Sequence, residues 1–244
     1  MEKFSWQFAQ VIDVVQETPA VKTFTLLLSH WIKHLPGQHY DIRLTAEDGY
    51  QAQRSYSIAS SPAQGPEIQL TVELVDEGEI SHYMHEVVAV GDFLEIRGPI
   101  GGHFVWSSNM VNDPLLLVAG GSGIVPLMAM LRHRAAIGAI NRTALLFSIR
   151  SAKDVIYRRE LELLSQQSHP PVILFTYTRN PPAGWSGFKR RIDREMLFDE
   201  LTGFEASPKC FVCGPLALVE QVAITLVDLG VPADKIRTER FGPS

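Results

Sequence analysis

The sequence predicts a β plus α/β fold, with an antiparallel β-barrel in the first half and a parallel-sheet, Rossmann-like domain in the second. Short alternating or β-branched runs, separated by turn signals such as Glu47-Asp-Gly, occupy the first hundred or so residues. Further on, apolar runs alternate with segments of helical period, which is typical of a parallel sheet covered by helices. The polar stretch Ser107–Asp113 lies between these patterns, so we expect domains over residues 1–109 and 110–244.

In the first half we expect six strands and one helix. Regular short strands with turn clusters between them are typical of a barrel or a sandwich. The expected helix is Ile80–Val87, and the strands are Phe8–Val15, Val21–Leu28, His39–Thr45, Arg54–Ala59, Glu67–Val75 and Phe93–Arg97.

In the second half the pattern predicts strands and helices in alternation, and such alternation favours parallel strands joined by helical crossovers. The expected strands are Leu115–Val118, Ala144–Ser148, Val172–Thr176 and Cys210–Val212. The expected helices are Pro126–Ala136, Tyr157–Gln166, Arg194–Leu201 and Leu216–Leu229, with Asp154 placed to begin the second of them.

Composition excludes several classes of function. A net charge of -5 argues against nucleic acid as the main partner, because phosphate binding needs a basic face. The longest apolar runs are too short for a membrane span, and the N-terminus lacks the pattern of a signal peptide, so we expect a cytoplasmic protein without membrane insertion. Cys210 and Cys213 are too few for an iron–sulfur cluster with four thiolates. No histidine spacing predicts a metal site.

The segment Arg54-Ser-Tyr-Ser-Ile58 suits a flavin. A bound flavin needs a cation for its phosphates, an aromatic face for its ring and a hydrogen-bond partner near N5. Arg54, Tyr56 and Ser57 offer these three groups on one extended strand. The same five residues also fit an ordinary edge strand with a half-buried tyrosine.

Two glycine-containing turns in the first half have both a binding and a structural interpretation. Gly78-Glu-Ile-Ser81 precedes the expected helix, where free N–H groups make either an anion site or an ordinary helix cap. The glycine-rich loop Gly98–Phe104 predicts close backbone approach to another group, or merely a tight turn.

A second glycine loop, Gly121-x-Gly123-x-x-Pro126, follows the apolar strand at Leu115–Val118. It departs from the dinucleotide-binding fingerprint at its third position, where proline nevertheless fits the first turn of a helix. The loop can direct its N–H groups at a pyrophosphate.

Arg150 lies where the second parallel strand ends, the position from which a side chain reaches the adenosine ribose. Its guanidinium suits a 2′-phosphate, with Ser148, Ser151 and Arg158 as helpers, and therefore favours NADPH while leaving NADH possible. Cys213 and Gly214 end a later strand at the edge where such sheets bind ligands. A buried cysteine acting as a small hydrophobic residue is the alternative, and it suits Cys210.

Taken together, these motifs resemble the ferredoxin–NADP reductase superfamily over nearly the whole chain, and in particular the bacterial reductases of oxygenase systems. The segments that carry the resemblance are R-S-Y-S-I at 54–58, G-E-I-S at 78–81, G-P-I-G-G-H-F at 98–104, G-G-S-G-I-V-P at 120–126, S-I-R-S at 148–151, F-V-C-G-P at 211–215 and T-E-R-F at 238–241. The chain departs from many relatives at Glu73, where they carry a basic residue, and in the Gly-Pro-Ser that follows Phe241.

The resemblance implies a flavin barrel that binds FAD and a five-stranded nucleotide domain that binds NAD(P)H. It places Ser57 near flavin N5, Cys213 near the carbon that gives up hydride, and Glu239 in the C-terminal segment that covers the flavin. These three are the expected catalytic residues. The expected cofactor-binding residues are Arg54, Tyr56, Ser57, Ile58, Gly78, Ser81, Gly121, Gly123, Pro126, Arg150, Ser151, Arg158, Cys213, Gly214, Pro215 and Phe241.

The function that the resemblance implies is an NAD(P)H-dependent flavoenzyme that passes electrons to a separate acceptor, a ferredoxin or an oxygenase component. One alternative is a reductase of free flavin, ferric chelates or another small acceptor. An alternative of another class is a nucleotide-sensing regulatory subunit, because a fold alone does not determine a function.

Overall fold

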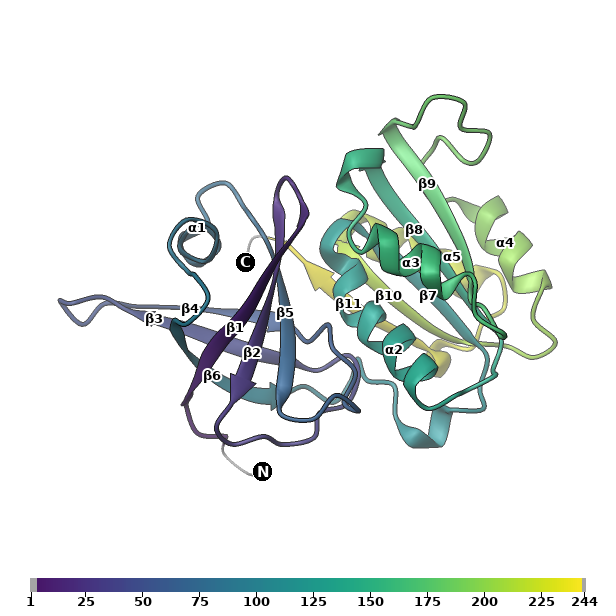
Figure 1. Ribbon diagram of the computed structural model, residues 1–244. Helices are drawn as coiled ribbons and strands as arrows, with labels where there is room; N and C mark the ends of the chain where they lie inside the picture. The colour runs from purple at the N-terminus through teal and green to yellow at the C-terminus, as the bar shows by residue number, and fades with distance from the viewer. Residues whose placement is uncertain (1–3, 243–244) are drawn as a thin grey trace. The chain divides into compact units, whose positions relative to one another are not determined.

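The computed structural model describes residues 4–242 and divides the chain into two units (Figure 1). The first unit extends to Ser107 and includes Met128–Ile137. The second comprises Ser108–Leu127 and the chain from Gly138 onward.

The first unit is built on a six-stranded antiparallel sheet in the order β4-β3-β6-β1-β2-β5. Its elements are β1 (Gln7–Thr18), β2 (Val21–Leu28), β3 (His39–Thr45), β4 (Gln51–Ser57), β5 (Glu67–Glu73), α1 (Glu79–Glu86) and β6 (Phe93–Ile100). A β-bridge between Ile58 and Leu70 joins the two edges of the sheet. The sheet therefore closes into the expected barrel.

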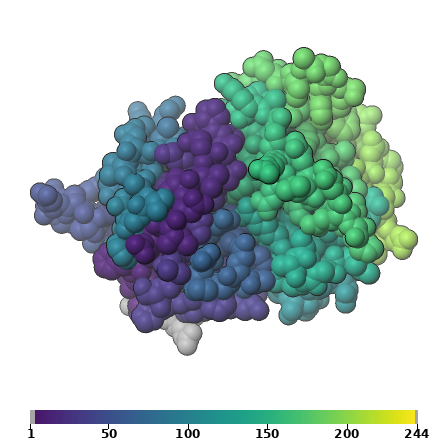
Figure 2. All heavy atoms as spheres, in the orientation of Figure 1, coloured from purple at the N-terminus to yellow at the C-terminus, as the bar shows by residue number. Residues whose placement is uncertain are grey.

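The barrel interior is filled by the inward residues of the alternating strands. Phe24, Leu26 and Ile42 are completely buried there, and Tyr40 lies among them. Helix α1 contributes its apolar face to the same core through residues such as Met84. Figure 2 shows the outer surface of this unit, from which the β3–β4 hairpin projects.

The second unit is a five-stranded parallel sheet in the order β11-β10-β7-β8-β9. Its strands are β7 (Leu115–Gly120), β8 (Thr143–Ser151), β9 (Val172–Asn180), β10 (Lys209–Pro215) and β11 (Ile236–Phe241). Its helices are α3 (Arg158–Leu164), α4 (Arg194–Thr202) and α5 (Leu216–Asp228), and α2 (Ile124–Ala136) is divided between the units. Four 3-10 turns complete the part of the chain that the structure describes: η1 (Ser108–Met110), η2 (Gly121–Gly123), η3 (Ala152–Asp154) and η4 (Ala233–Lys235).

Burial of both faces explains why the strands of the second unit are continuous apolar runs. One face packs against α4 and α5, with Val118, Leu146 and Val212 in contact with residues such as Met196 and Val222. Every residue of β7 is buried. The predicted architecture of barrel followed by parallel sheet is confirmed.

The bounds of most elements differ from the expected ones by a few residues, as in β4, which covers Gln51–Ser57 and not Arg54–Ala59, and three further differences have a clear local cause. Helix α2 begins at Ile124 rather than Pro126, which leaves the proline in the first turn, where it needs no N–H partner. Helix α3 begins at Arg158, because Tyr157 takes a left-handed conformation with φ of 58°. Strand β11 is the fifth strand that the resemblance implied but the residue pattern did not predict, since its Arg-Thr-Glu-Arg sequence is half-exposed at the edge of the sheet and lacks an apolar run.

Among residues 4–242, no helix has both the length and the apolar character that a membrane span requires. Over the same part of the chain, no group of three or more histidine, cysteine, aspartate or glutamate side chains is arranged to hold a metal ion.

Candidate cofactor sites

Arg54 and Tyr56 lie on the same face of β4, opposite Ile42 and Tyr40 of β3. Arg54 is exposed, and its guanidinium donates to the carbonyl of Gln53 at 2.9 Å. Tyr56 is half-buried and packs against the barrel core. Burial raises the pKa of Tyr56 to about 12, although nearby Arg54 opposes this shift. The face therefore presents a neutral phenol ring beside a cation, as a flavin and its phosphates require.

Ser57 and Ile58 lie deeper than their two predecessors. Ser57 is 5% exposed and lies opposite His39 of β3 in the register of the sheet. Ile58 is completely buried, and its N–H donates to the carbonyl of Gln38 at 2.9 Å. Neither the side chain nor the N–H of Ile58 is thus open to a ligand. The catalytic role of Ser57 and the cofactor contact of Ile58 stay predictions.

The opposite face of β4 carries a polar network that sequence reasoning missed. Ser55 Oγ donates to Asp41 Oδ1 at 2.6 Å, and Arg97 donates to Asp41 Oδ2 at 2.7 Å. The Asp41 side chain is 6% exposed, so the charge-assisted bonds form largely away from water. They join β4 to β3 and β6 behind Arg54. In the sequence, only the position of Asp41 within an alternating strand indicated such a network.

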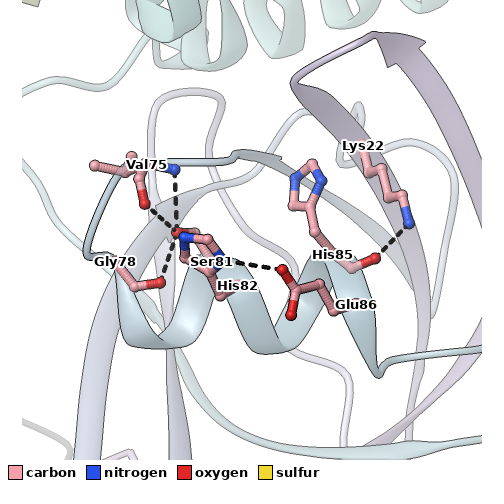
Figure 3. Close-up of polar contacts among 7 residues, drawn as sticks. All are labelled: Lys22, Val75, Gly78, Ser81, His82, His85 and Glu86. Carbon is pink, nitrogen blue, oxygen red and sulfur yellow. Dashed lines mark hydrogen bonds and ion pairs between the residues drawn. The ribbon is translucent and has the colours of Figure 1, made fainter.

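The turn before α1 is fixed by Ser81 (Figure 3). Its hydroxyl donates to the carbonyl of Gly78 at 2.8 Å and accepts the N–H of Val75 at 3.2 Å. Gly78 begins the helix without a side-chain cap, and a Cβ there would lie 2.4 Å from Ser81 Oγ. The Ser81 hydroxyl therefore holds the turn. The groups left for an anion are the N–H groups of the first helical turn.

The glycine-rich loop Gly98–Phe104 was open to two interpretations. A Cβ on Gly98 would lie 2.7 Å from the ring of Tyr40. The close approach at Gly98 is thus to the barrel core, and this glycine is explained by packing.

In the second unit, glycines bring the loop after β7 against the end of β10. A Cβ on Gly123 would lie 2.2 Å from the carbonyl oxygen of Cys213, and one on Gly214 would lie 3.0 Å from backbone atoms of Gly120. Gly121 has φ of 55°, with no atom within 4 Å of a Cβ built there. Backbone therefore packs on backbone, as a loop that offers N–H groups to a pyrophosphate requires.

Cys213 lies in β10 between Ala119 of β7 and Glu239 of β11 in the register of the sheet. It is completely buried, and burial raises the pKa of its thiol well above the ordinary value, with Glu239 adding to the shift. The side chain is therefore a neutral thiol and not a nucleophilic thiolate. Cys210 lies on the other face, in the core shared with α4 and α5.

Two further predicted residues, Pro215 and Phe241, are the last residues of β10 and β11. Pro215 caps the N-terminus of α5, and Phe241 pairs with it in the register of β10 and β11. Phe241 is half-buried. The catalytic role of Glu239 and the flavin contact of Phe241 stay predictions.

The end of β8 and the turn η3 that follows it carry the predicted residues Arg150, Ser151 and Asp154. Arg150 is exposed, and Arg158 donates to the carbonyl of Ala152 at 2.7 Å. Ser151 Oγ donates to Asp154 Oδ2 at 2.7 Å. The expectation that Asp154 begins the next helix was wrong: Tyr157 precedes α3, and the Asp154 carboxylate accepts a hydrogen bond from Ser151 at the strand end instead.

An aromatic cluster beside this turn was also missed. The rings of Tyr177 and Trp185 meet edge to face with their centroids 4.9 Å apart, and Tyr177 pairs with Ile149 in the sheet. Burial raises the pKa of Tyr177, while Arg158 lowers it. The two rings come from a strand and a following loop, so no local spacing signals their contact.

Comparisons with known proteins agree with the two-part architecture. The family profile "oxidoreductase FAD-binding domain" matches residues 9–106, and "oxidoreductase NAD-binding domain" matches residues 117–223. The glycine betaine monooxygenase reductase subunit of Pseudomonas aeruginosa is 30% identical over 236 residues, which are 96% of this chain and 63% of that protein. Ferredoxin–NADP reductase B of Sorangium cellulosum is 34% identical over 199 residues, covering 79% and 80% of the two chains.

Among solved structures, the FAD/NAD-binding domain of a nitric oxide dioxygenase from Vibrio cholerae superposes with a TM-score of 0.82 at 24% identity. The match covers 97% of this chain and 99% of that one. The chain spans less than two thirds of the length of the monooxygenase reductase subunits that it matches.

Proposed function

Because the chain belongs to the family of FAD- and NAD-binding oxidoreductases that includes ferredoxin–NADP reductase, we propose that it is an NAD(P)H-dependent flavoenzyme that passes electrons to a separate acceptor. The matching FAD-binding and NAD-binding domains confirm the predicted resemblance and the predicted pair of cofactors. The relatives' names support the reductase activity.

The observation that carries the proposal is the pairing of two differently built sites in one chain. Arg54 offers a cation for the flavin phosphates, and half-buried Tyr56 offers a ring face. In the second unit, Gly123 has no Cβ, so the backbone of Cys213 can occupy the space that a side chain would fill. FAD, when bound, supplies hydride acceptance and the release of single electrons.

The side chains of the two sites have positioning and electrostatic roles in this proposal. Hydride transfer requires that donor and acceptor atoms approach to roughly 3–3.5 Å. The buried thiol of Cys213 adds no charge where the nicotinamide is expected, because its pKa is raised. Ser57, 5% exposed, can give a hydrogen bond near the flavin without admitting bulk water.

An oxygenase component or a ferredoxin is the acceptor that we propose. The relatives include a glycine betaine monooxygenase reductase subunit and a phenol hydroxylase P5 protein, along with a ferredoxin–NADP reductase. We propose the cytoplasm as the compartment, because an NAD(P)H-dependent reductase needs a supply of reduced nucleotide, which the cytoplasm provides.

For the nucleotide we propose NADPH, with NADH as a second donor. Exposed Arg150 supports this choice, because a guanidinium meets a 2′-phosphate with paired hydrogen bonds. The carboxylate of Asp154, held at Ser151, opposes it by like-charge repulsion. Replacing Asp154 by asparagine should therefore improve the use of NADPH, and kcat/KM for the two nucleotides would measure the change.

The test of the proposed function is reduction of the bound flavin under anaerobic conditions. A yellow preparation should bleach when NADPH is added, and a regulatory subunit would stay yellow. Rates with a purified ferredoxin, free flavin and a ferric chelate then identify the acceptor class. Faster reduction of free flavin or chelate than of any protein acceptor would contradict the proposed partner.

A further inference from the structure

Two residues of the sheet, Lys22 and Val72, hold the C-terminal end of helix α1. Lys22 of β2 lies opposite Val72 of β5 in the antiparallel register. Lys22 Nζ donates to the backbone carbonyl of His85 at 2.7 Å. The His85 ring Nε2 lies 3.0 Å from the carbonyl oxygen of Val72 and is the donor, since a carbonyl can only accept. His85 is thus fixed through both its backbone and its side chain (Figure 3).

Each contact satisfies a group that would otherwise lack a partner. The last carbonyls of a helix receive no hydrogen bond from within the helix. A lysine at that end supplies one and also complements the negative end of the helix dipole. Strand β5 is the last in the order of the sheet and is joined to the other edge only at the Ile58–Leu70 bridge, so the carbonyl of Val72, two residues further on, has no partner on that side among the described strands. The two contacts therefore bind α1 to that edge, above the buried side chains of Ile80 and Met84.

The other end of α1 carries the turn expected to receive the flavin pyrophosphate. That turn is internally fixed by Ser81, which bonds to Gly78 and Val75. A helix of eight residues is about 12 Å long and moves as a rod. The first turn has a contact of its own, since the Tyr50 hydroxyl donates to the Glu79 carboxylate at 3.1 Å, so the direction of its N–H groups depends on that contact together with those at the far end.

We propose that Lys22 and His85 are positioning residues for the flavin, which set the direction of the α1 N-terminus so that its N–H groups meet the pyrophosphate. The proposal rests on FAD binding in the proposed function. Neither residue lies at the expected flavin contacts, and both act through the helix.

The chain offers a matched control on the same helix. His82 is three residues before His85, and its Nδ1 lies 3.1 Å from the carboxylate of Glu86 at the surface. His82→Phe and His85→Phe make the same chemical change, but the second removes the donor to the sheet. Lys22→Arg keeps a cationic donor, whereas Lys22→Met keeps the length and loses the charge.

The experiment is dilution of the purified holoproteins, with the fluorescence of released FAD giving the dissociation constant. Lys22→Met should raise it about tenfold, the lower end expected for losing one charge-assisted hydrogen bond, and His85→Phe about fivefold, as for the loss of one ordinary hydrogen bond. His82→Phe and Lys22→Arg should stay within about twofold of the wild type.

Equal weakening by His82→Phe and His85→Phe would overturn the proposal, as would unchanged FAD binding in both His85→Phe and Lys22→Met. If Lys22→Met does not fold, His85→Phe with its control still decides. The dilution measurement needs no nucleotide, so failure of NADPH to reduce the flavin remains a separate result that bears on the proposed function alone.

Discussion

The two candidate sites are organised by different means. In the first unit, Arg54 and Tyr56 lie on a strand fixed from behind by the Asp41 network, and α1 is held by hydrogen bonds at both ends. In the second unit, Gly123 and Gly214 pack backbone against backbone. A site held by several side chains can lose one contact and persist, whereas a backbone contact fails when a single methyl group is added.

The largest expected effect is that of Gly123→Ala. The new Cβ would lie 2.2 Å from the Cys213 carbonyl oxygen, so the loop or β10 must shift, at a cost of about 3 kcal/mol or more. Gly121→Ala meets open space and carries only the cost of its left-handed conformation, about 1–2 kcal/mol. Thermal melting and kcat/KM for NADPH should both rank Gly123→Ala as the worse. Equal losses in the two variants would contradict the backbone contact as the cause.

The next effect concerns flavin retention in the first unit. Arg54→Ala removes a charge-assisted phosphate contact of about 1.5–3 kcal/mol. Tyr56→Phe keeps the ring, whose stacking contributes about 0.5–1.5 kcal/mol. The flavin-to-protein absorbance ratio after purification should therefore fall much further in Arg54→Ala. Full flavin occupancy in that variant would show that the phosphates bind elsewhere.

A smaller effect separates the two cysteines of β10. Both are buried, but Cys213 lies beside Glu239 and Cys210 lies in the core against α4 and α5. Cys213→Ala should retain its flavin. Its activation free energy should rise by about 1 kcal/mol, which lowers turnover about fivefold. Cys210→Ala should turn over at the wild-type rate. If steady-state rates fall equally in both, the strand has a purely structural role.

An effect seen only on acidification is a pH dependence of stability that belongs to the first unit. His34 is completely buried with Nε2 3.0 Å from the carbonyl of Ser60, and burial lowers its pKa from 6.5 despite that contact, with His133 lowering it further. Because the folded pKa is depressed, acid protonates the unfolded chain first. Stability should be complete above about pH 6.5 and fall below it, by up to about 1.4 kcal/mol per pH unit.

The variant His34→Gln removes this titration. Thermal melts from about pH 7 to pH 5.5 should show a flatter profile for His34→Gln than for the wild type. Parallel profiles would mean that the acid sensitivity arises from another group.

Local patterns in the sequence predicted most of the fold. The apolar run Leu115–Val118 and the alternation in Val21–Leu28 were enough to predict strands, because burial on one or both faces sets the side-chain period. Strand β11 escaped because its half-exposed edge carries Arg237, Thr238, Glu239 and Arg240. No apolar period remains in such a strand.

The sequence predicted which residue types form the candidate cofactor sites, but it did not predict the contacts between them. Arg54 and Tyr56 came from one strand, whose alternation fixes their shared face. Asp41 meets Arg97 across 56 positions of the chain, a pairing that only the sheet register creates. The start of α3 at Arg158 follows the left-handed Tyr157, an unusual conformation for that residue type that the sequence does not signal.

The central claim is that the first unit holds the flavin and the second selects the nucleotide. The most direct measurement is bound FAD together with the NADP⁺ dissociation constant, in Arg54→Ala and in Arg150→Ala. We expect Arg54→Ala to lose FAD and bind NADP⁺ as the wild type does. Arg150→Ala should keep its FAD and bind NADP⁺ roughly tenfold to a hundredfold more weakly. Loss of both cofactors to a similar extent in either variant would contradict the division of labour between the two units.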